Sequence, residues 1–556
     1  MLRYRLSAFS LLVTVFLAAM GQVGELPRST PEAEGVDPVL LNHFYHKITT
    51  LPDVDIHHMM VLRHGKVIGE MHAAPYRATD LHTLYSASKT VTALAVGLAV
   101  DDGLLSVDDK VSKHLRDKMP ATLSPALDSL TVRNLLMMAS GRLEDLSIFM
   151  GDEDWLTAWF KGDFHDVGQV FHYDSMCTHA LAMIVTRVTG KPLLEYVKER
   201  IFAPMHIVEA DWELAPDSVE TAGWGLRLQT ESQAKLGLLM LSGGKWNGKQ
   251  LVSSQWIHDM TQRHISTSHA VQPKLSLWQR FLKCLRSAWH TVRSWFTGYN
   301  TDDYYLGYGY QTKAIQHPRA ESFFAAGYGG QLIYVVPKLD LVIVINGRAA
   351  EYGDELNTIY YQFVNPLIGG NVPDVKDGSV ALAVDMPQGV ATHPMEDHLF
   401  KGRVKLDKNL LGLQAIEVSP SGSDRIFTMF DWRGPLQAVA ACGEWRFTTS
   451  DDRPIYIMES REQLVGTKRP FTSVAAYAWQ GDTLSMRVDW LDGGDNRRLK
   501  MVLDGDDVTI IANDNFDPLI TDTIHGSITR RCLLIDTLLT FNFSLLTPNF
   551  SLLTPN

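Results

Sequence analysis

"LYSASKTVTALAVGLAVDDGLL", residues 84–105, places a serine, Ser86, three positions before a lysine, Lys89. From residue 90 to residue 100 the apolar side chains recur at intervals of three and four, which predicts a buried helix that ends at Gly103. Positions i and i+3 share one helix face, so the Lys89 amine can reach the Ser86 hydroxyl. The pair has two interpretations: a nucleophile with its proton acceptor, or a serine in the first helical turn beside an exposed lysine.

The Ser-x-x-Lys spacing occurs three times, at Ser86, Ser232 and Ser242, so the context of each copy has to distinguish them. Ser242 lies in "SGGKWNG", a turn with two glycines that would not hold its side chain against Lys245. Ser232 lies in "TESQAKLGLLM", where we expect a solvated first helical turn. Only Ser86 begins a strongly apolar helix, whose N-terminus favours a developing oxyanion and whose burial makes Lys89 a better base.

Length and composition place the chain among ordinary globular proteins. At 556 residues it is long enough for two or more domains. A net charge of −12 argues against a general nucleic-acid binder, which needs a basic face. The four cysteines lie far apart, without a Cys-x-x-Cys pair or histidines at zinc spacing, so neither a disulfide framework nor a metal site is predicted.

The first residues of the chain have the sequence pattern of an export signal. Arg3 and Arg5 precede the apolar run "LSAFSLLVTVFLAAM", and a small-x-small site follows at Ala19 and Gly21. This pattern predicts a signal peptide over residues 1–21 and a periplasmic or secreted protein. A retained N-terminal anchor is the alternative, which the shortness of the run disfavours because a spanning helix needs ~20 apolar residues.

Residues 22–375 are expected to form one mixed α/β unit. Residues 58–72 predict a β-hairpin with its turn at His64 and Gly65, and a helix-rich region follows. Strand character returns in "YLGYGYQTK" and in "GGQLIYVVPKLDLVIVIN", where two apolar runs are joined by residues 337–340. Strands at both ends of the region indicate a sheet completed by segments that are distant in the sequence.

After residue 375 short strands alternate with Gly and Asp turns. This pattern predicts an all-β barrel or sandwich over residues 376–525, and a lipocalin-like barrel is one possible form. The acidic clusters at 492–495 and 504–507 lack EF-hand spacing and lie between strands, so we expect hairpin turns there rather than calcium loops. Residues 526–556, which hold "FSLLTPN" twice in tandem, are expected to be a tail.

A basic aromatic segment interrupts the first unit at about residues 274–298. In "LSLWQRFLKCLRSAWHTVRSWF", residues 275–296, the large apolar side chains fall on one helical face and lysines and arginines supply positive charge. The segment has three interpretations: an interfacial helix in peripheral contact with a membrane, a lid over a substrate cleft, or a packed surface helix.

Seven ordered segments resemble the serine β-lactamase-related hydrolases, most closely the branch of 6-aminohexanoate-dimer hydrolases and β-lactamase-like carboxylesterases. They span about residues 27–370 and are "RSTPEAEGVD", "MVLRHGKVIGE", "APYRATDLHTLYSASKT", "LLMMASG", "FHYDSMCTHALAMIVTRVTGKPLLEYV", "GWGLRLQTESQAKLGLLMLSGGKWNGKQLVSSQWI" and "AAGYGGQLIYVVP". The resemblance implies an α/β (α+β) fold of the β-lactamase/transpeptidase type, in which helices flank an antiparallel sheet and a helical subdomain is inserted. It also implies a serine hydrolase without a metal or organic cofactor.

The resemblance assigns roles to particular residues. Ser86 becomes the acylated nucleophile, Lys89 its partner, and Tyr173 of "YDS" the phenolic acid or base that protonates the leaving group. The backbone N–H groups of Ser86 and Gln331 become the oxyanion hole. The residues implied to bind substrate are Ser175, Tyr328, Gly329 and Gly330. An adjacent ammonium is expected to favour the Tyr173 phenolate, and whether Lys89 or Tyr173 takes the first proton stays open. Taken without the resemblance, Tyr173 is a packing residue and "GYGG" a turn.

Two departures from the family pattern bear on the substrate. Ser175 stands where β-lactamases usually carry Asn, and "GYGG" offers Tyr328 instead of the strand cation that receives a substrate carboxylate. Loss of that charge-assisted contact predicts poor recognition of penicillins and D-Ala-D-Ala ends. We therefore expect a hydrolase of uncharged esters or small linear amides. The alternatives are a class C-like β-lactamase or D,D-peptidase, and a catalytically silent binding protein on the same scaffold.

Overall fold

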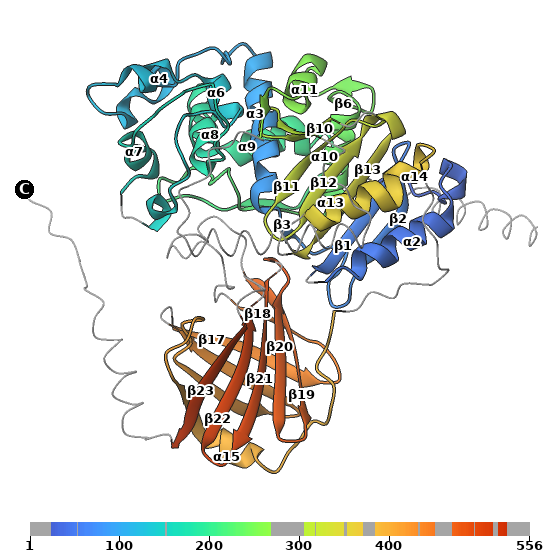
Figure 1. Ribbon diagram of the computed structural model, residues 1–556, viewed down its shortest axis with the longest axis vertical. Helices are drawn as coiled ribbons and strands as arrows, with labels where there is room; N and C mark the ends of the chain where they lie inside the picture. The colour runs from blue at the N-terminus through green and yellow to red at the C-terminus, as the bar shows by residue number, and fades with distance from the viewer. Residues whose placement is uncertain are drawn as a thin grey trace, which may run out of the picture. The chain divides into compact units, whose positions relative to one another are not determined.

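The computed structural model describes the chain in eleven segments, which are 24–52, 54–150, 153–267, 305–316, 319–349, 353–370, 384–431, 434–450, 470–493, 495–514 and 521–530. The expected signal peptide, the basic aromatic segment and the tandem repeat lie outside these residues. The chain divides into two units (Figure 1). The first comprises Met1–Val384, Tyr456–Arg469 and Leu491–Gly494; the second comprises Asp385–Ile455, Pro470–Trp490 and Asp495–Asn556. Among the described helices, none combines the length and the apolar character that crossing a membrane requires.

The first unit is built on an eight-stranded antiparallel sheet with the order β2-β1-β13-β12-β11-β10-β9-β8. Its strands are β1 (Val54–Arg63), β2 (Lys66–His72), β8 (Ile265–Ser266), β9 (Tyr305–Tyr308), β10 (Lys313–Gln316), β11 (Ser322–Gly327), β12 (Gln331–Val336) and β13 (Leu341–Ala349). The predicted hairpin is confirmed, with positive φ at His64 and Gly65 in its turn. Strand β1 pairs with β13 along its whole length, so distant segments complete the sheet as expected.

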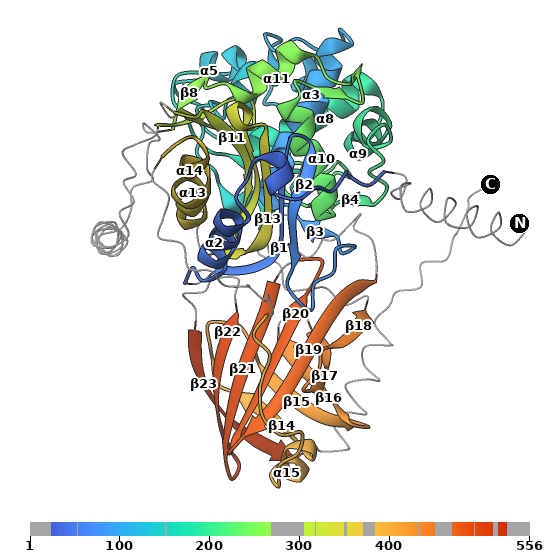
Figure 2. The ribbon, with the colours of Figure 1, turned by 90° about the vertical axis from the view of Figure 1, so that its right-hand side faces the viewer.

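Both faces of this sheet are covered by helices, as Figure 2 shows edge-on. Helices α2 (Pro38–Thr49), α13 (Gly353–Ile359) and α14 (Asn365–Leu367) lie on one face, and α10 (Thr230–Leu241) and α3 (Ser88–Asp101) on the other. Along β12 the side chains alternate between two apolar cores. Leu332 and Tyr334 belong to the first core, on the side of α2 and α13, and Ile333 and Val335 belong to the second core, on the side of α3 and α10. Because both faces of the sheet are buried, the sequence of this strand is a continuous apolar run.

Helix α3 runs through the second of these cores, and each of its residues from Ser88 to Ala99 is buried. It packs beside α8 (Ser175–Thr189), and Gly103, at φ 71°, ends it as predicted. Its neighbours are α4 (Val111–Leu115), α5 (Pro125–Ser129), α6 (Val132–Leu136), α7 (Trp155–Phe160), α9 (Leu193–Val197), α11 (Ser254–Thr261) and helical turns at Glu32–Glu34, Arg116–Lys118, Leu146–Met150, Lys198–Phe202, Pro337–Leu339 and Tyr360–Val364. Two small sheets complete the unit: β3 (His82–Thr83), β4 (Ala210–Trp212) and β5 (Leu226–Leu228); β6 (Lys245–Trp246) and β7 (Lys249–Gln250).

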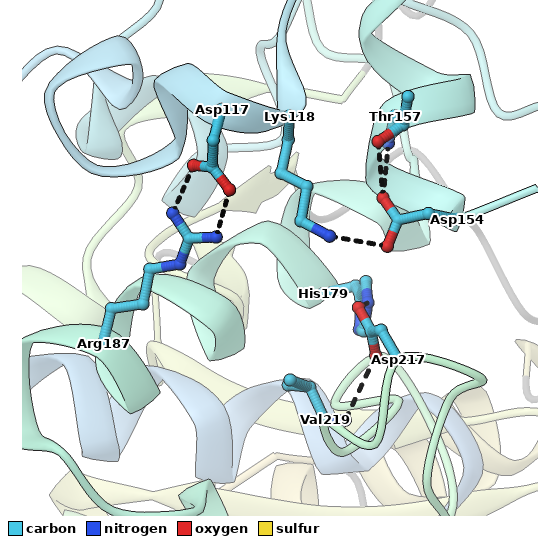
Figure 3. A network of polar contacts seen from close by, with 8 residues as sticks. All are labelled: Asp117, Lys118, Asp154, Thr157, His179, Arg187, Asp217 and Val219. Carbon is cyan, nitrogen blue, oxygen red and sulfur yellow. Dashed lines mark hydrogen bonds and ion pairs between the residues drawn. The ribbon is translucent and has the colours of Figure 1, made fainter. Parts of the chain in front are cut away.

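A polar network fixes α8 to the surrounding loops (Figure 3). His179 Nε2 lies 3.2 Å from Asp217 Oδ2, and the other carboxylate oxygen accepts the Val219 N–H at 3.1 Å. Nearer the end of the helix, Arg187 donates to both oxygens of Asp117. The remaining residues drawn in Figure 3 are Lys118, Asp154 and Thr157. The network holds the loop that continues from residue 217 towards the centre of the unit, where its backbone meets a buried lysine.

The second unit is an all-β barrel, as the sequence predicted. Its strands are β14 (Gly402–Leu406), β15 (Ala415–Ser421), β16 (Asp424–Asp431), β17 (Gly434–Cys442), β18 (Arg446–Ser450), β19 (Phe471–Gln480), β20 (Thr483–Trp490), β21 (Asp495–Asp504), β22 (Asp507–Asp514) and β23 (Thr521–Arg530), with the short helix α15 (Glu396–Phe400). Pairing of β17 with β19 closes the sheet on itself. Alternate side chains fill its interior, as in β20, where Leu484, Met486 and Val488 belong to one apolar core.

The boundaries of this unit differ in part from expectation. The predicted start at residue 376 falls among residues that the structure does not describe, whereas β23 extends beyond the predicted end at 525 to Arg530. Both acidic clusters lie at hairpin connections, between β20 and β21 and between β21 and β22. Within the described part of the chain no group of three or more His, Cys, Asp or Glu residues is arranged to hold a metal ion.

Candidate active site

Ser86 lies in a helical turn, Tyr85–Ala87, that leads directly into α3. The turn is held by backbone hydrogen bonds from Leu84 N to Leu226 O, 2.8 Å, and from Ala87 N to Leu84 O, 3.0 Å. Tyr85 adopts a left-handed backbone with φ 44°, a conformation that costs energy in a residue with a side chain. The strained turn presents the Ser86 hydroxyl at the helix N-terminus, where it lines a cavity.

Lys89 follows one turn later and is 1% exposed. Its Nζ donates to three oxygens: Ser86 Oγ at 3.1 Å, Ser175 Oγ at 3.1 Å and the Gly223 carbonyl at 2.6 Å. The carbonyl can only accept, whereas both hydroxyls can also donate. A neutral Lys89 can therefore keep its bond to Gly223 and turn its lone pair to the Ser86 hydroxyl.

The surroundings of Lys89 favour that neutral form. Burial lowers the pKa of Lys89 to about 8, while the charges of Glu144, Asp174 and Cys177 oppose the shift. A lysine with a pKa near the working pH is a much better proton acceptor than a solvated one. The burial of Lys89 expected from the sequence is confirmed, and its role as an activated amine stays a prediction.

Tyr173 approaches the same two side chains from the loop before α8. The Lys89 ammonium lies 4.8 Å from the centre of its ring, and its hydroxyl is hydrogen-bonded to Ser86. Burial raises the pKa of Tyr173, the Ser86 hydrogen bond opposes this shift, and Glu144 adds to it. The expectation that the nearby ammonium favours a phenolate does not agree with this direction, which burial dominates. The raised pKa favours the protonated phenol, which is suited to donating a proton.

Ser175 is the first residue of α8 and contacts Lys89 rather than the open cavity. Its N–H donates to Glu144 Oε1 at 3.1 Å, and Asp174 caps the helix by accepting the Met176 N–H at 2.9 Å. Burial raises the pKa of Asp174 to about 7, against the hydrogen bonds from Met176 and Trp159. Ser175 thus holds the lysine in place, and the described cavity lining does not include it.

The "GYGG" strand element lies beside Ser86, but the residues that line the cavity are not all the ones that we expected. Gly327 and Tyr328 line the cavity, whereas Gly329, Gly330 and Gln331 are absent from its described lining. The buried Gln331 side chain turns away and donates to the carbonyls of Tyr328, Gly329 and Gly347. Gln331 therefore fixes the turn between β11 and β12, and an oxyanion role for its backbone N–H stays a prediction.

Gly327 is required by a close approach. A Cβ at this position would lie 2.0 Å from the carbonyl oxygen of Leu84, so only glycine lets β11 touch the turn that carries Ser86. Tyr328 then packs edge-on against Tyr85, with ring centres 5.9 Å apart.

The cavity beside Ser86 has a volume of about 390 Å³, within the usual range for small-molecule sites. Its described lining is Ser86, Phe171, Tyr173, Thr267, Leu306, Gly307, Tyr308, Lys313, Phe324, Ala326, Gly327 and Tyr328. Most of the walls are aromatic or aliphatic. Lys313 is a cation that the sequence reasoning missed, because it belongs to β10 and not to the "GYGG" element that the family pattern singles out.

The other two Ser-x-x-Lys copies do not form such a site. Ser232 lies within α10 and is 3% exposed, so the expected solvent contact is wrong; its partner by spacing, Lys235, donates to the His206 carbonyl at 3.3 Å. Ser242 follows α10, donates to the carbonyls of Leu238 and Lys245, and is not held by an amine.

The fold and the site together define a class: a helix-flanked antiparallel sheet that presents serine, lysine and tyrosine at one cavity. The family model Beta-lactamase matches residues 58–359, so the chain belongs to the β-lactamase family, whose fold is that of the serine hydrolases.

Individual relatives are more distant. A 6-aminohexanoate-dimer hydrolase of Paenarthrobacter ureafaciens is 26% identical over 226 residues, covering 36% of this chain and 56% of the relative. Protein flp of Staphylococcus aureus strain N315 is 24% identical over 163 residues, covering 27% and 32%. The chain thus spans about half or less of the length of these curated relatives.

Solved structures with a similar fold include two penicillin-binding protein homologues. The octameric homologue from Pyrococcus abyssi has a TM-score of 0.45 and 15% identity, covering 88% of this chain and 100% of its own. The homologue from Caulobacter crescentus has a TM-score of 0.44 and 16% identity, covering 60% and 97%.

Proposed function

We propose that this protein is a serine hydrolase that cleaves esters or small linear amides through an acyl-enzyme on Ser86. The observation that carries the proposal is the 3.1 Å hydrogen bond between Lys89 Nζ and Ser86 Oγ. Ser86 and Tyr173 both line the cavity beside this bond. The similarity to a 6-aminohexanoate-dimer hydrolase supports the substrate class.

Acylation follows from the hydrogen-bond geometry. Neutral Lys89 accepts the Ser86 proton as Oγ attacks the substrate carbonyl, and the carbonyl π electrons move to its oxygen. Collapse of the tetrahedral intermediate breaks the bond to the leaving group, which takes a proton from the Tyr173 phenol. The Lys89 ammonium, 4.8 Å from the Tyr173 ring centre, is the nearby proton source that restores the phenol.

Deacylation repeats these roles with water as the nucleophile and Ser86 as the leaving group. A water molecule attacks the acyl carbonyl and gives up its proton to neutral Lys89. Ser86 Oγ takes a proton from the Tyr173 phenol as the acyl bond breaks, and the Lys89 ammonium then restores the phenol. The N–H of Ser86 is one expected oxyanion donor. For the second donor we favour the backbone of Gly327 and Tyr328, because these residues, and not Gln331, line the described cavity.

The proposal is tested with a panel of p-nitrophenyl esters, nitrocefin and the linear 6-aminohexanoate dimer. We expect ester or amide turnover that Ser86→Ala and Lys89→Met reduce by roughly 10³-fold or more, while Ser242→Ala, a matched control from another Ser-x-x-Lys copy, keeps wild-type rates. Rapid nitrocefin turnover without ester or amide hydrolysis would instead favour a β-lactamase. Equal rates in wild type and Ser86→Ala would exclude the proposed nucleophile.

We also propose that the protein is exported, on the basis of the signal-peptide pattern in residues 1–21. N-terminal sequencing of the protein recovered from the periplasm or medium should begin at Gln22. Full-length protein confined to the cytoplasm would contradict the proposal.

A further inference from the structure

A second lysine shares the cavity with Ser86. Lys313 is the first residue of β10, is partly buried, and pairs in register with Phe324 of β11. Its ammonium lies 5.9 Å from the centre of the Phe324 ring, and its side chain lines the cavity together with Ser86 and Tyr173. A titratable amine therefore borders the space in which a substrate must lie to reach the serine.

The surroundings of Lys313 destabilise the charged form of its amine. The walls beside Lys313 are apolar or aromatic and include Phe171, Tyr308, Phe324 and Ala326. Burial lowers the pKa of Lys313 to about 7, and the nearby charge of Lys89 adds to the shift. Both effects disfavour the charged form of the amine and are opposed by a nearby negative charge. A titratable group whose pKa is shifted in this way inside a cleft is typical of a functional site.

We propose that Lys313 is a specificity-determining residue that binds a carboxylate of the substrate while the scissile carbonyl lies against Ser86. The inference rests on the proposed function and narrows it to esters or amides that carry a carboxylate on an apolar chain. It differs from the substrate expectation from the sequence, which favoured uncharged esters. The "GYGG" element lacks a cation, but the neighbouring strand β10 supplies one to the same cavity.

The chemistry of the cavity is consistent with such a ligand. Its aromatic walls can cover an alkyl or aryl chain, and a carboxylate beside Lys313 would restore the favourable charged form of the amine. A charge-assisted hydrogen bond in a site sheltered from water is stronger than the same bond in solvent. The carboxylate can belong to the acyl part or to the leaving group, and two pairs of esters distinguish these cases.

The acyl pair is the p-nitrophenyl monoester of glutaric acid and p-nitrophenyl pentanoate; the leaving-group pair is 4-acetoxybenzoate and phenyl acetate. For one of these pairs we expect Lys313→Met to lower the ratio of kcat/KM, anionic over neutral ester, by roughly 10- to 100-fold. The ratio is the readout, because a general loss of packing at Lys313 would lower the rates with both esters of a pair alike. Lys249→Met, which removes an exposed lysine of the same unit, is the matched control and should leave both ratios unchanged.

A measurement on the wild-type protein avoids dependence on a variant that fails to fold. Glutarate should protect Ser86 from a fluorophosphonate probe at concentrations at which glutaramide, its neutral analogue, does not. Unchanged ratios for both ester pairs in Lys313→Met, or equal protection by glutarate and glutaramide, would overturn the inference and leave the proposed hydrolase intact. Absence of any ester hydrolysis together with absence of Ser86 labelling is a different result, because it removes the proposed function itself.

Discussion

Replacing Lys89 by methionine should change the pH dependence of stability as well as abolish activity. Burial lowers the pKa of Lys89 from 10.5 to about 8 in the folded protein. The unfolded chain therefore binds more protons than the folded one between these two values, and the free energy of unfolding of the wild type should rise with pH across that window. Methionine has no proton to bind, so the variant lacks this contribution.

The size of the effect follows from the shift in pKa. At 1.36 kcal/mol per unit, the difference in free energy of unfolding, wild type minus Lys89→Met, should increase by about 3 kcal/mol between pH 8 and pH 10.5. Below the folded-state pKa the wild type carries the full penalty for burying an ammonium. In that range the difference in free energy of unfolding, wild type minus Lys89→Met, is therefore at its lowest. The lost hydrogen bonds to Ser86, Ser175 and Gly223 shift the whole difference by a constant and do not change this slope.

The assay is urea unfolding at half-unit steps of pH, followed by circular dichroism and tryptophan fluorescence, for wild type, Lys89→Met and the exposed control Lys249→Met. The control should run parallel to the wild type. Ester hydrolysis measured in the same buffers should rise with pH and level off above the pKa of about 8, because the reaction uses the neutral amine. Parallel stability curves for wild type and Lys89→Met would show that Lys89 is not a desolvated amine.

Three further variants test neighbouring parts of the account. Tyr173→Phe should lower kcat by about 10²- to 10⁴-fold, because the leaving group loses its proton donor, while intact-mass measurement still finds the fluorophosphonate adduct. Gly327→Ala forces a Cβ to within 2.0 Å of the Leu84 carbonyl and should cost about 1–3 kcal/mol and roughly 10² in kcat by displacing the adjacent nucleophile turn; wild-type kinetics would refute the close approach. Gly97→Ala places a Cβ 2.2 Å from the Trp256 ring and should cost about 1–3 kcal/mol in urea unfolding, with kcat per folded molecule unchanged.

Much of the fold could be predicted from the sequence, because its local patterns agree with its tertiary structure. The His64–Gly65 turn, the buried helix that ends near Gly103 and the paired strands around residues 337–340 all follow from periodicity and turn chemistry. The close spacing of short strands with Gly and Asp turns also predicted the all-β unit. The strand boundaries were less predictable. Strand β23 runs to Arg530 because its pairing with β14 continues to Gly402 opposite Arg530, whereas its pairing with β22 ends at Ser527.

The site residues that belong to a sequence motif could be predicted, whereas those that reach the site through tertiary contacts could not. Spacing and resemblance pointed to Ser86, Lys89 and Tyr173, and the structure brings these three together. The Gly223 carbonyl, which holds Lys89, gives no sequence signal, because any residue has a carbonyl. Lys313 was missed because its position opposite Phe324 depends on strand register.

The most direct test of the account is to identify the covalent intermediate. Protein mixed with p-nitrophenyl acetate, quenched in acid within the first turnover and digested, should yield the peptide containing Ser86 with the mass of one added acetyl group. Tyr173→Phe should accumulate that species for longer, while Ser86→Ala should lack it. Turnover of the ester without acylation of this peptide, or with acylation mapped to another residue, would contradict the central claim.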